Sequence, residues 1–434
     1  MRTVAFVPAK GESSRIRNKN TVILDGEYLF KRKLIQLLAC PEIDDVYLDT
    51  ESDKIIELAS DLPVKILKRN AKLASNTTDG HELFANECAK VDADIYIQCL
   101  CTSPFVTAET MTRAIRALKA DASADSLVAV QKRKQYTWEN GRPAYGEGRI
   151  PNSVDLPATV IESMGLYMVK RGKGKAKAKP KRRFGEKVVF FELTDEEAFD
   201  VNWPDDLALA ERISAGYRAA HNAQLDAIRP HLCASLLADI CKERGLKALF
   251  PPGFRRVSGR SVLGVAKTLE LRKLRKKDDW KGIYTALGTY DFIRPGDVIV
   301  VQNDVKERAY FGDLNANISI RSGAVGAVVD SYTRDSAELN GLEFSVFAQG
   351  IYCDDIKYEG TVHAMNRPIK IGNVTINNGD YVYADDDGVL AIPKDLWPSI
   401  RDEAMATLKK EFDIRYAIIM GEDVGKVLGT HGAF

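Results

Sequence analysis

Short apolar runs alternate with longer mixed stretches over the first hundred residues of the chain. Alternation of strand-length and helix-length segments predicts an α/β domain built on a doubly wound sheet. A ligand of such a sheet binds beyond the carboxyl ends of the strands, so the residues after each apolar run are the first candidates for a site. The expected strands are residues 4–7, 46–48 and 94–100, and the expected helices are residues 30–40, 54–59 and 81–90.

The pattern changes in the second half of the chain. Residues 219–245 are predicted to be helical and to bridge the halves without a Pro/Gly linker. From Val257 onward, short strands and glycine turns follow one another. A chain of 434 residues is long for one core, so we expect two domains, residues 1–215 and residues 216–434.

A small, basic loop at residues 8–20 follows the first apolar run directly. Gly11 allows a ligand to approach the backbone, and free N–H groups in such a loop bind anions. Lys10, Arg15 and Lys19 add the positive charge that a triphosphate requires. The alternative is an ordinary strand-to-helix turn with solvated charges, because an isolated glycine-rich match is a weak signal.

The order of residues in this loop resembles the signature V/I-P-A-R-x-G-S-K-R-I-x-x-K-N of the CMP-sugar synthetases, the cytidylyltransferases that activate sialic acid and 3-deoxy-manno-octulosonate. Lys10 replaces the family arginine, and Glu12 replaces a glycine, so we expect Glu12 to point away from the triphosphate. The resemblance implies a Rossmann-like nucleotidyltransferase domain with CTP as substrate and Lys10, Arg15 and Lys19 as catalytic residues. The implied nucleotide-binding residues are Pro8, Ala9, Lys10, Gly11, Ser13, Lys19, Asn20 and Thr78.

Later segments resemble the same family in order and spacing. The family has arginine and glutamine before an Asp-Leu-Pro motif, and Ser153 and Val154 stand there in this chain, which predicts a different acceptor. Residues 199–207 resemble the closing motif I-D-I-D-T-P-x-D-L, whose two aspartates share one face of a strand and hold Mg²⁺. By this resemblance Asp200 and Asn202 are ligands of Mg²⁺ or Mn²⁺.

A low-complexity basic segment occupies residues 171–183. It is either an RNA- or lipid-binding arm or a loop between strands, and we favour the loop because no aromatic residue is interleaved to stack on bases.

The formal net charge of +1 argues against a general polyanion binder. No apolar run is long enough to span a bilayer, and no signal-peptide core follows the N-terminus. We therefore expect a cytoplasmic protein with neither a membrane nor a nucleic-acid partner.

The seven cysteines are scattered and odd in number. Cys99 and Cys101 are the only close pair, and they lack a partner pair or a histidine at zinc spacing. We expect reduced, buried thiols.

Ordered motifs across residues 225–415, among them P-G-D-V-x-V-V, F-G-D-L-x-A and G-D-x-V-x-A-D, resemble the superfamily of the RNase E inhibitor-like (RraA-like) proteins and the 4-hydroxy-4-methyl-2-oxoglutarate aldolases. The resemblance implies an α/β/β swivelling-type domain. The aldolases carry a carboxylate, twenty intervening residues and then Arg-Asp, and Asp313 with Arg334 and Asp335 has that spacing. The alternative is a surface Arg-Asp pair, which is worth little by itself.

The aldolase resemblance implies a role for each of these residues. Arg334 would bind the carboxylate or keto oxygen of a 2-oxo acid and act with Asp335 in catalysis, while Asp313 and Asp335 organise a divalent metal. The implied substrate-binding residues are Gly312, Asp313, Leu314, Asn315 and Arg334.

Two hypotheses for the whole chain follow. The first is a bifunctional enzyme: CTP-dependent cytidylyl transfer to a 3-deoxy-2-ulosonic or sialic-type sugar acid, with release of pyrophosphate, joined to a metal-dependent pyruvate aldolase or 2-oxo acid decarboxylase. The alternative is an active cytidylyltransferase, with a phosphonate as another acceptor, joined to a non-catalytic binding or oligomerisation module. In both cases the expected partners are small molecules and further copies of the chain.

Overall fold

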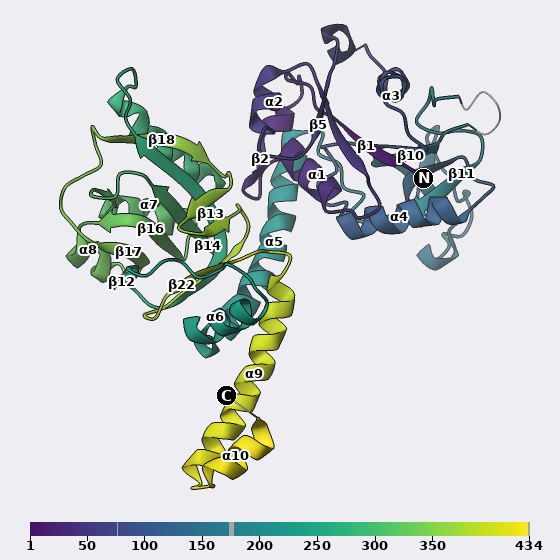
Figure 1. Cartoon of the computed structure of the whole chain (residues 1–434). Helices are drawn as coiled ribbons and strands as arrows, with labels where there is room; N and C mark the ends of the chain where they lie inside the picture. Colours follow the sequence, from purple (N-terminus) through teal and green to yellow (C-terminus); the bar gives the residue numbers. More distant parts are fainter. Residues whose placement is uncertain (76, 173–177, 433–434) are drawn as a thin grey trace. The chain divides into compact units, whose positions relative to one another are not determined.

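The computed structural model describes residues 1–75, 77–172 and 178–432. These residues form two compact units, Met1–Ile213 and Ser214–Phe434, and helix α5 (Pro204–Ile228) contains the boundary between them (Figure 1). Residues 173–177, at the centre of the basic segment, lie outside the described part of the chain. Within the described residues, the search for a membrane-crossing helix found no candidate of sufficient length and apolarity.

The first unit is a mixed sheet with helices on both faces. Helices α1 (Leu29–Leu38), α2 (Asp53–Leu58) and α4 (Ala108–Ala120) contribute to the core on one face, and α3 (Gly80–Lys90) contributes to the core on the other. Strand β10 is antiparallel to its two neighbours, whereas the remaining pairs of the sheet are parallel. In spatial order the strands are β11 (Val188–Glu192), β7 (Ser126–Arg133), β10 (Thr159–Lys170), β6 (Ile95–Cys99), β1 (Thr3–Pro8), β4 (Asp45–Thr50) and β5 (Lys65–Lys68).

Strand β1 is apolar at successive positions because both of its faces are buried. Val4 and Phe6 point into the core beside α3, whereas Ala5 and Val7 point into the core beside α1. Parallel pairing with β4 and β6 brings the carboxyl ends of the three strands to one edge of the sheet. The predicted doubly wound α/β fold is confirmed, and its ligand edge carries the loop at residues 8–20.

The second unit is a mixed sheet with parallel strands at its centre. Its two faces have separate apolar cores, and a third core joins the sheet to α6 (Ala234–Glu243) and α9 (Trp397–Ile419). The other helical segments are η5 (Trp280–Phe292), α7 (Asp313–Ser322), α8 (Ser336–Gly341) and α10 (Val424–His431). In spatial order the strands are β12 (Arg255–Ser258), β17 (Ser345–Ile351), β16 (Gly326–Thr333), β14 (Asp297–Asn303), β13 (Val262–Lys273), β21 (Tyr381–Ala384) and β22 (Val389–Ile392), while β15 (Ala309–Phe311) pairs with β16 and β18 (Gly360–Met365) pairs with β13.

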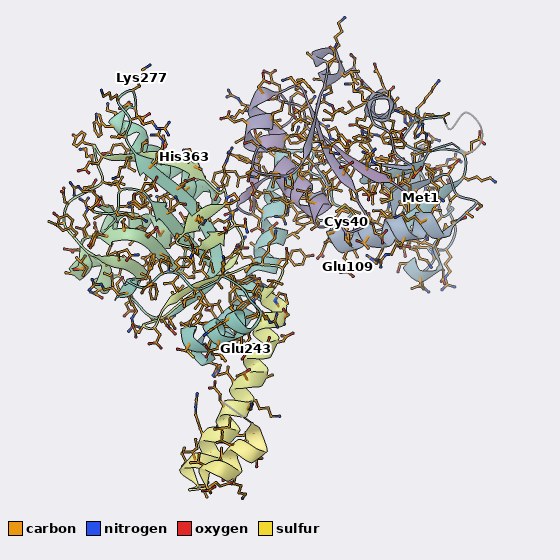
Figure 2. All side chains as sticks on the ribbon, in the orientation of Figure 1. Met1, Cys40, Glu109, Glu243, Lys277 and His363 are labelled. Atoms are coloured by element: carbon orange, nitrogen blue, oxygen red, sulfur yellow. The ribbon has the colours of Figure 1, made fainter. Side chains whose placement is uncertain are left out.

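Small hairpins complete the two units. They are β2 (Ile23–Leu24) with β3 (Glu27–Tyr28), β8 (Trp138–Glu139) with β9 (Arg142–Pro143), and β19 (Ile369–Ile371) with β20 (Val374–Ile376). The basic stretch at residues 269–282 covers the end of β13 and the loop that follows it. Figure 2 shows Lys277 at the outer end of that loop.

The prediction of one helical segment over residues 219–245 was wrong. Helix α5 ends at Ile228, a short 3₁₀ turn follows at Arg229–His231, and α6 begins at Ala234. Pro230 explains the break, since proline has no N–H to donate and its ring clashes with the preceding turn.

The expected strand at residues 199–202 is also absent from the described structure, because this segment forms no ladder with a neighbouring strand. The N–H groups of Asn202 and Trp203 instead donate to Asp206 Oδ2, both at 2.8 Å, as the chain enters α5. Asp200 and Asn202 still contact each other through their side chains.

The expectation for the cysteines holds in part. All seven are described and free, and five are buried, but Cys233 and Cys353 are exposed. Both exposed residues lie in connecting segments rather than in the core of a sheet.

Candidate functional sites

A pocket of about 210 Å³ lies at the carboxyl edge of the first sheet. Its walls come from the loops that follow β1, β5 and β6. Of the predicted nucleotide-binding residues, the pocket is lined by Pro8, Lys10, Ser13, Lys19, Asn20 and Thr78. Ala9 is fully buried, and Glu12 is exposed and is not among the lining residues.

Hydrogen bonds fix the shape of the loop after β1. The Asn20 side chain donates to the carbonyl oxygen of Lys10 at 2.8 Å, which closes the loop on itself. The N–H of Gly11 donates to Glu51 Oε1 at 2.6 Å. This N–H group, which the sequence predicted to bind phosphate, is therefore already bonded to a carboxylate. A Cβ at Gly11 would lie 3.0 Å from Ser52 Cβ. Glycine therefore lets this loop pack closely against the end of β4.

Lys19 connects this loop to the segment that precedes α5. Its side chain is 9% exposed, and Nζ donates to the carbonyl oxygen of Val201 at 3.0 Å. Burial lowers the pKa of Lys19, and the negative charge of Asp200 opposes that shift. Arg15 is exposed and lies over the ring of Trp203, 5.5 Å from its centroid. Residues 200–203 are thus held at the first loop, although they are distant in sequence.

Asp200 has a carboxylate oxygen that suits a cation. Its Oδ2 accepts a hydrogen bond from the Asn202 side-chain amide, whereas its Oδ1 is buried and has no hydrogen-bond partner within the described structure. A buried carboxylate oxygen without a partner is costly, and Mg²⁺ and Mn²⁺ prefer oxygen ligands. The described residues contain no group of three or more His, Cys, Asp or Glu that would hold an ion alone. The site therefore fits a cation that is completed by phosphate oxygens and water.

Arg69 also lines this pocket, and the sequence analysis missed it. It is 5% exposed, and its guanidinium lies 2.9 Å from Glu51 Oε2 and 3.5 Å from Asp49 Oδ2. Asp49 lies in β4, and Arg69 follows the short strand β5, whose sequence Lys-Ile-Leu-Lys matches no motif. The guanidinium is positioned by two carboxylates next to the space that the loop residues enclose.

A second pocket, of about 600 Å³, lies in the second unit. Its walls come from the first turn of α7, the end of β16, η5 and the loop before β18. The structure brings together at this pocket all the residues predicted for the 2-oxo acid: Gly312, Asp313, Leu314, Asn315, Arg334 and Asp335.

Asp335 is the centre of this group. It begins α8 in the left-handed region, with φ of 57°, and its Oδ2 lies 3.6 Å from Arg334 Nε. The same oxygen accepts from the N–H of Asp313 at 3.4 Å. A Cβ at Gly312 would lie 2.4 Å from Asp335 Oδ2, so only glycine leaves room for the carboxylate.

Asp355 is a second residue that the sequence analysis missed. Its Oδ2 lies 2.9 Å from Arg334 Nη1, and its Oδ1 accepts from the N–H of Lys357 at 2.7 Å. Half-buried Tyr290 donates to Asn315, which lines the pocket, and burial raises the pKa of Tyr290 to about 12. Asp355 lies twenty residues after Asp335 in a segment without a motif, so only the fold reveals its contact with Arg334.

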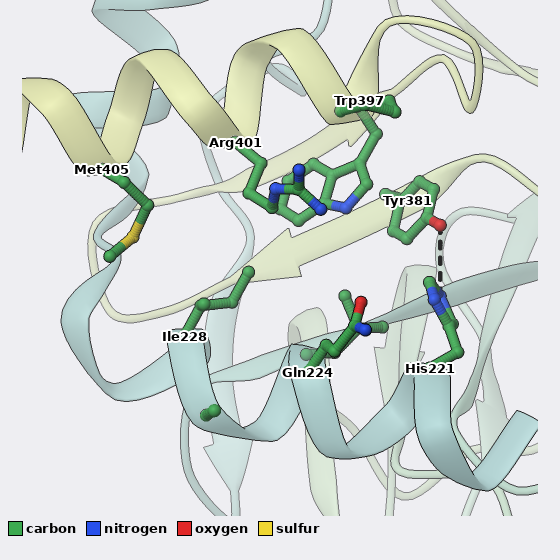
Figure 3. A pocket seen from close by; sticks show the side chains of 10 residues that line it. His221, Gln224, Ile228, Tyr381, Trp397, Arg401 and Met405 are labelled. Atoms are coloured by element: carbon green, nitrogen blue, oxygen red, sulfur yellow. Dashed lines mark hydrogen bonds between the residues drawn. The ribbon is translucent and has the colours of Figure 1, made fainter.

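A third pocket, of about 500 Å³, lies between α5, β21 and α9 (Figure 3). Three of its polar side chains have partners: Tyr381 Oη lies 3.1 Å from His221 Nε2, and Arg401 pairs with Asp402 at 2.7 Å. The rings of Tyr381 and Trp397 stack with centroids 4.7 Å apart. This groove is apolar, and no sequence motif falls on it.

Comparison with known proteins gives a family for each unit. A family model described as Cytidylyltransferase matches residues 4–143, and one described as Aldolase/RraA matches residues 234–391. A Bacillus cereus protein named "Putative 4-hydroxy-4-methyl-2-oxoglutarate aldolase" is 30% identical over 129 residues, which are 30% of this chain and 79% of that protein. Protein DlpA of Legionella pneumophila is 31% identical over 166 residues, 38% of this chain. The match spans only 26% of DlpA.

Solved structures include relatives of both units. CMP:2-keto-3-deoxy-manno-octonic acid synthetase complexed with CTP is 12% identical, with a TM-score of 0.37, and the match covers 50% of this chain and all of that one. Streptomyces coelicolor RraAS2, described as an unusual member of the RNase ES inhibitor RraA protein family, is 26% identical with a TM-score of 0.39, covering 42% and 91%.

The chain thus joins a nucleotidyltransferase-type unit to a second α/β unit. Its second half belongs to the RraA-like family, and residues 4–143 of its first half match the cytidylyltransferase family model. Both resemblances drawn from the sequence are confirmed.

Proposed function

We propose that the first unit transfers a cytidylyl group from CTP to an acidic acceptor and that the second unit cleaves or decarboxylates a 2-oxo acid. The observation that carries the first activity is that the loop after β1 and buried Lys19 line one pocket, while Lys19 bonds the carbonyl oxygen of Val201, the residue next to Asp200 with its unpartnered oxygen. These groups match the charge of a triphosphate with its cation.

In the proposed transfer, an acceptor oxygen attacks the α-phosphorus of CTP. A new P–O bond forms as the bond to pyrophosphate breaks, and the acceptor proton passes to solvent. Lys10, Arg15 and Lys19 neutralise the charge that develops on the phosphates. Asp200 and Asn202 would hold Mg²⁺ or Mn²⁺, which supplies further charge neutralisation when bound.

The proposed class of acceptor depends on the two residues that replace the family's arginine and glutamine before the Asp-Leu-Pro motif. Ser153 and Val154 stand in the 3₁₀ turn Ser153–Asp155, and both are exposed. Neither offers the charged donor that the resemblance implies for a sugar-acid carboxylate. We therefore include phosphonates beside ulosonic and sialic-type acids as acceptors.

Pyrophosphate release tests the first activity. Wild-type protein is incubated with CTP, Mg²⁺ and a panel of acidic sugars and phosphonates, and pyrophosphate is followed. At least one acceptor should give CTP-dependent release that Lys19→Met reduces about 10²-fold, while Lys54→Met, at an exposed position on α2, leaves the rate unchanged. Release that is absent with every acceptor, or equal in Lys19→Met and wild type, would refute the proposal.

The second activity rests on the gathering of Arg334, Asp335 and Asp313 at one cavity. Arg334 would bind the 2-oxo acid carboxylate, the amides in the first turn of α7 would hold its other end, and Asp313 and Asp335 would hold a divalent ion. In aldol cleavage the 4-hydroxyl group would lose its proton to solvent as the C3–C4 bond breaks, which releases a carbonyl compound and leaves an enolate that takes up a proton to give pyruvate. In decarboxylation the same enolate would form as CO2 leaves.

One observation favours the alternative, a non-catalytic module. The charge of Arg334 is already compensated by Asp355 and Asp335. Pyruvate release from 4-hydroxy-4-methyl-2-oxoglutarate and from oxaloacetate distinguishes a catalytic second unit from a non-catalytic module. An aldolase or decarboxylase loses this release on Arg334→Ala, whereas a binding module shows none in the wild type.

A further inference from the structure

Helix α9 carries an apolar stripe of which four residues are exposed in the described part of the chain. Its first half packs into the core through Trp397, Ile400 and Ala404, and its second half packs on α10 through Ile414 and Ala417. The remaining side contains large apolar residues with exposed fractions from 40% to 80%: Met405 (40%), Phe412 (68%), Tyr416 (59%) and Ile419 (80%). Leu408 lies between the first two of these residues; it is half-buried and packs on one side against the core that joins α9 to the sheet.

These five residues form a single stripe, here called the α9 stripe. Their spacings are three, four, four and three residues. At 100° per residue, such spacings keep all five side chains on one side of a helix, as in the seam of a coiled coil. The spacing order is the same from either end, with Phe412 at the midpoint. A stripe with this symmetry is complementary to itself in the antiparallel direction.

We propose that the α9 stripe binds the α9 stripe of a second copy of this chain in an antiparallel, two-fold symmetric pair. Phe412 packs against Phe412 of the second copy, Met405 packs against Ile419, and Leu408 packs against Tyr416. A two-fold contact uses the same surface of both copies, which is the commonest form of self-association.

The charges beside the stripe permit this pairing. Lys409 and Asp413 lie along one edge, and Glu411 and Arg415 lie along the other, where they already form an ion pair at 2.6 Å. In an antiparallel pair each edge meets its own counterpart. Each edge carries one positive and one negative residue, so neither edge repels itself.

The position of α9 favours a second copy over a family ligand as the occupant. The RraA-like match ends at residue 391, so α9 and α10 lie beyond the family region. Met405 lies at one end of the groove in Figure 3, opposite the His221–Tyr381 pair. Ile419 of the second copy would therefore cover the open end of an apolar groove, and the pairing buries both features together.

Disulfide trapping tests the pairing and its direction. In full-length protein with Cys233→Ser and Cys353→Ser, Met405→Cys and Ile419→Cys variants are oxidised singly and as an equimolar mixture. The mixture should give disulfide-linked dimers that neither variant gives alone, and Phe412→Cys should give them by itself. Dimers from each single variant, or none from the mixture, would overturn the antiparallel pair.

The mass of the protein in solution tests whether a second copy of the chain binds the α9 stripe. By sedimentation velocity, Phe412→Glu should halve the mass of the wild-type assembly, while Ala406→Glu, on another side of α9, leaves it unchanged. Circular dichroism should show that both variants are folded. If the first unit of the same chain or an unrelated partner covered the stripe, Phe412→Glu and wild type would have equal masses, and the proposal would be wrong.

Discussion

At the scale of single residues, the first site depends on a buried cation beside a buried carboxylate. Lys19 is held by the carbonyl oxygen of Val201, and Asp200 lies close enough for its charge to act on Lys19. Burial lowers the pKa of Lys19, since desolvation disfavours the charged ammonium. A triphosphate would supply the missing negative charge, so ligand binding should stabilise protonated Lys19.

The fall of the transfer rate at high pH should report the deprotonation of Lys19. Only protonated Lys19 neutralises phosphate charge, so the rate falls as pH rises through its lowered pKa, below the ordinary lysine value of about 10.4. Lys19→Arg keeps its charge to a higher pH. The pH–rate profile of pyrophosphate release should therefore lose this alkaline limb in the variant. An identical limb in both proteins would show that another group titrates.

Substitution of Gly312 tests the packing of the second site. A methyl group there would collide with Asp335 Oδ2, so Gly312→Ala should displace the carboxylate and cost about 1–3 kcal/mol of stability. Thermal unfolding should show a Tm lower by several degrees, together with loss of pyruvate release. Gly341→Ala is the matched control, because no described atom lies within 4 Å of its Cβ. Equal Tm values for the two variants would contradict the packing argument.

At the scale of elements, a buried acid pair joins three parts of the first unit. Asp49 on β4 and Glu87 on α3 are both fully buried, and Gln98 on β6 donates to Glu87 at 2.6 Å. Asp49 and Glu87 interact through their side chains, with protonated Glu87 as the donor, and Arg69 supplies the nearby positive charge. Burial raises the pKa of Asp49 and raises that of Glu87 well above its ordinary value.

This pair should make stability depend on pH. Because the folded-state pKa of Glu87 is raised, its contribution is fully present below the ordinary carboxyl value of about 4.3 and is lost as pH rises through the raised pKa. In urea unfolding at a series of pH values, Glu87→Gln should lose less free energy of unfolding than wild type as pH rises. Glu82→Gln, at an exposed position on α3, should follow wild type. Parallel curves for Glu87→Gln and wild type would contradict a protonated Glu87.

Sequence patterns predicted the elements of the first unit well because a strand buried on both faces leaves an unmistakable apolar run, as at Val4–Val7. They failed at residues 219–245, where helical pattern continues on both sides of Pro230. Motifs marked the residues of the loop after β1 and the Arg-Asp pair. Arg69 and Asp355 escaped because their contacts join segments that only the folded chain brings together.

At the scale of the whole molecule, each unit has its own apolar cores and its own pocket. The residues proposed for one activity all belong to one unit. A substitution in one pocket should therefore leave the chemistry of the other intact, because the two pockets share no lining residue.

Arg334→Ala tests this separation. Pyruvate release should fall about 10²-fold, the scale expected for removing a donor to developing charge, while pyrophosphate release from CTP is unchanged. Arg321→Ala, at an exposed position on α7, should change neither activity. Loss of pyrophosphate release in Arg334→Ala would indicate that the two units act as one site.

The central claim is that the loop after β1 binds a nucleoside triphosphate, and calorimetric titration with CTP and Mg²⁺ tests it without knowledge of the acceptor. Wild-type protein should bind one CTP per chain, and Lys19→Met should bind at least about tenfold more weakly, equivalent to about 1.4 kcal/mol. Absence of CTP binding, or equal affinity of wild type and Lys19→Met, would contradict the account.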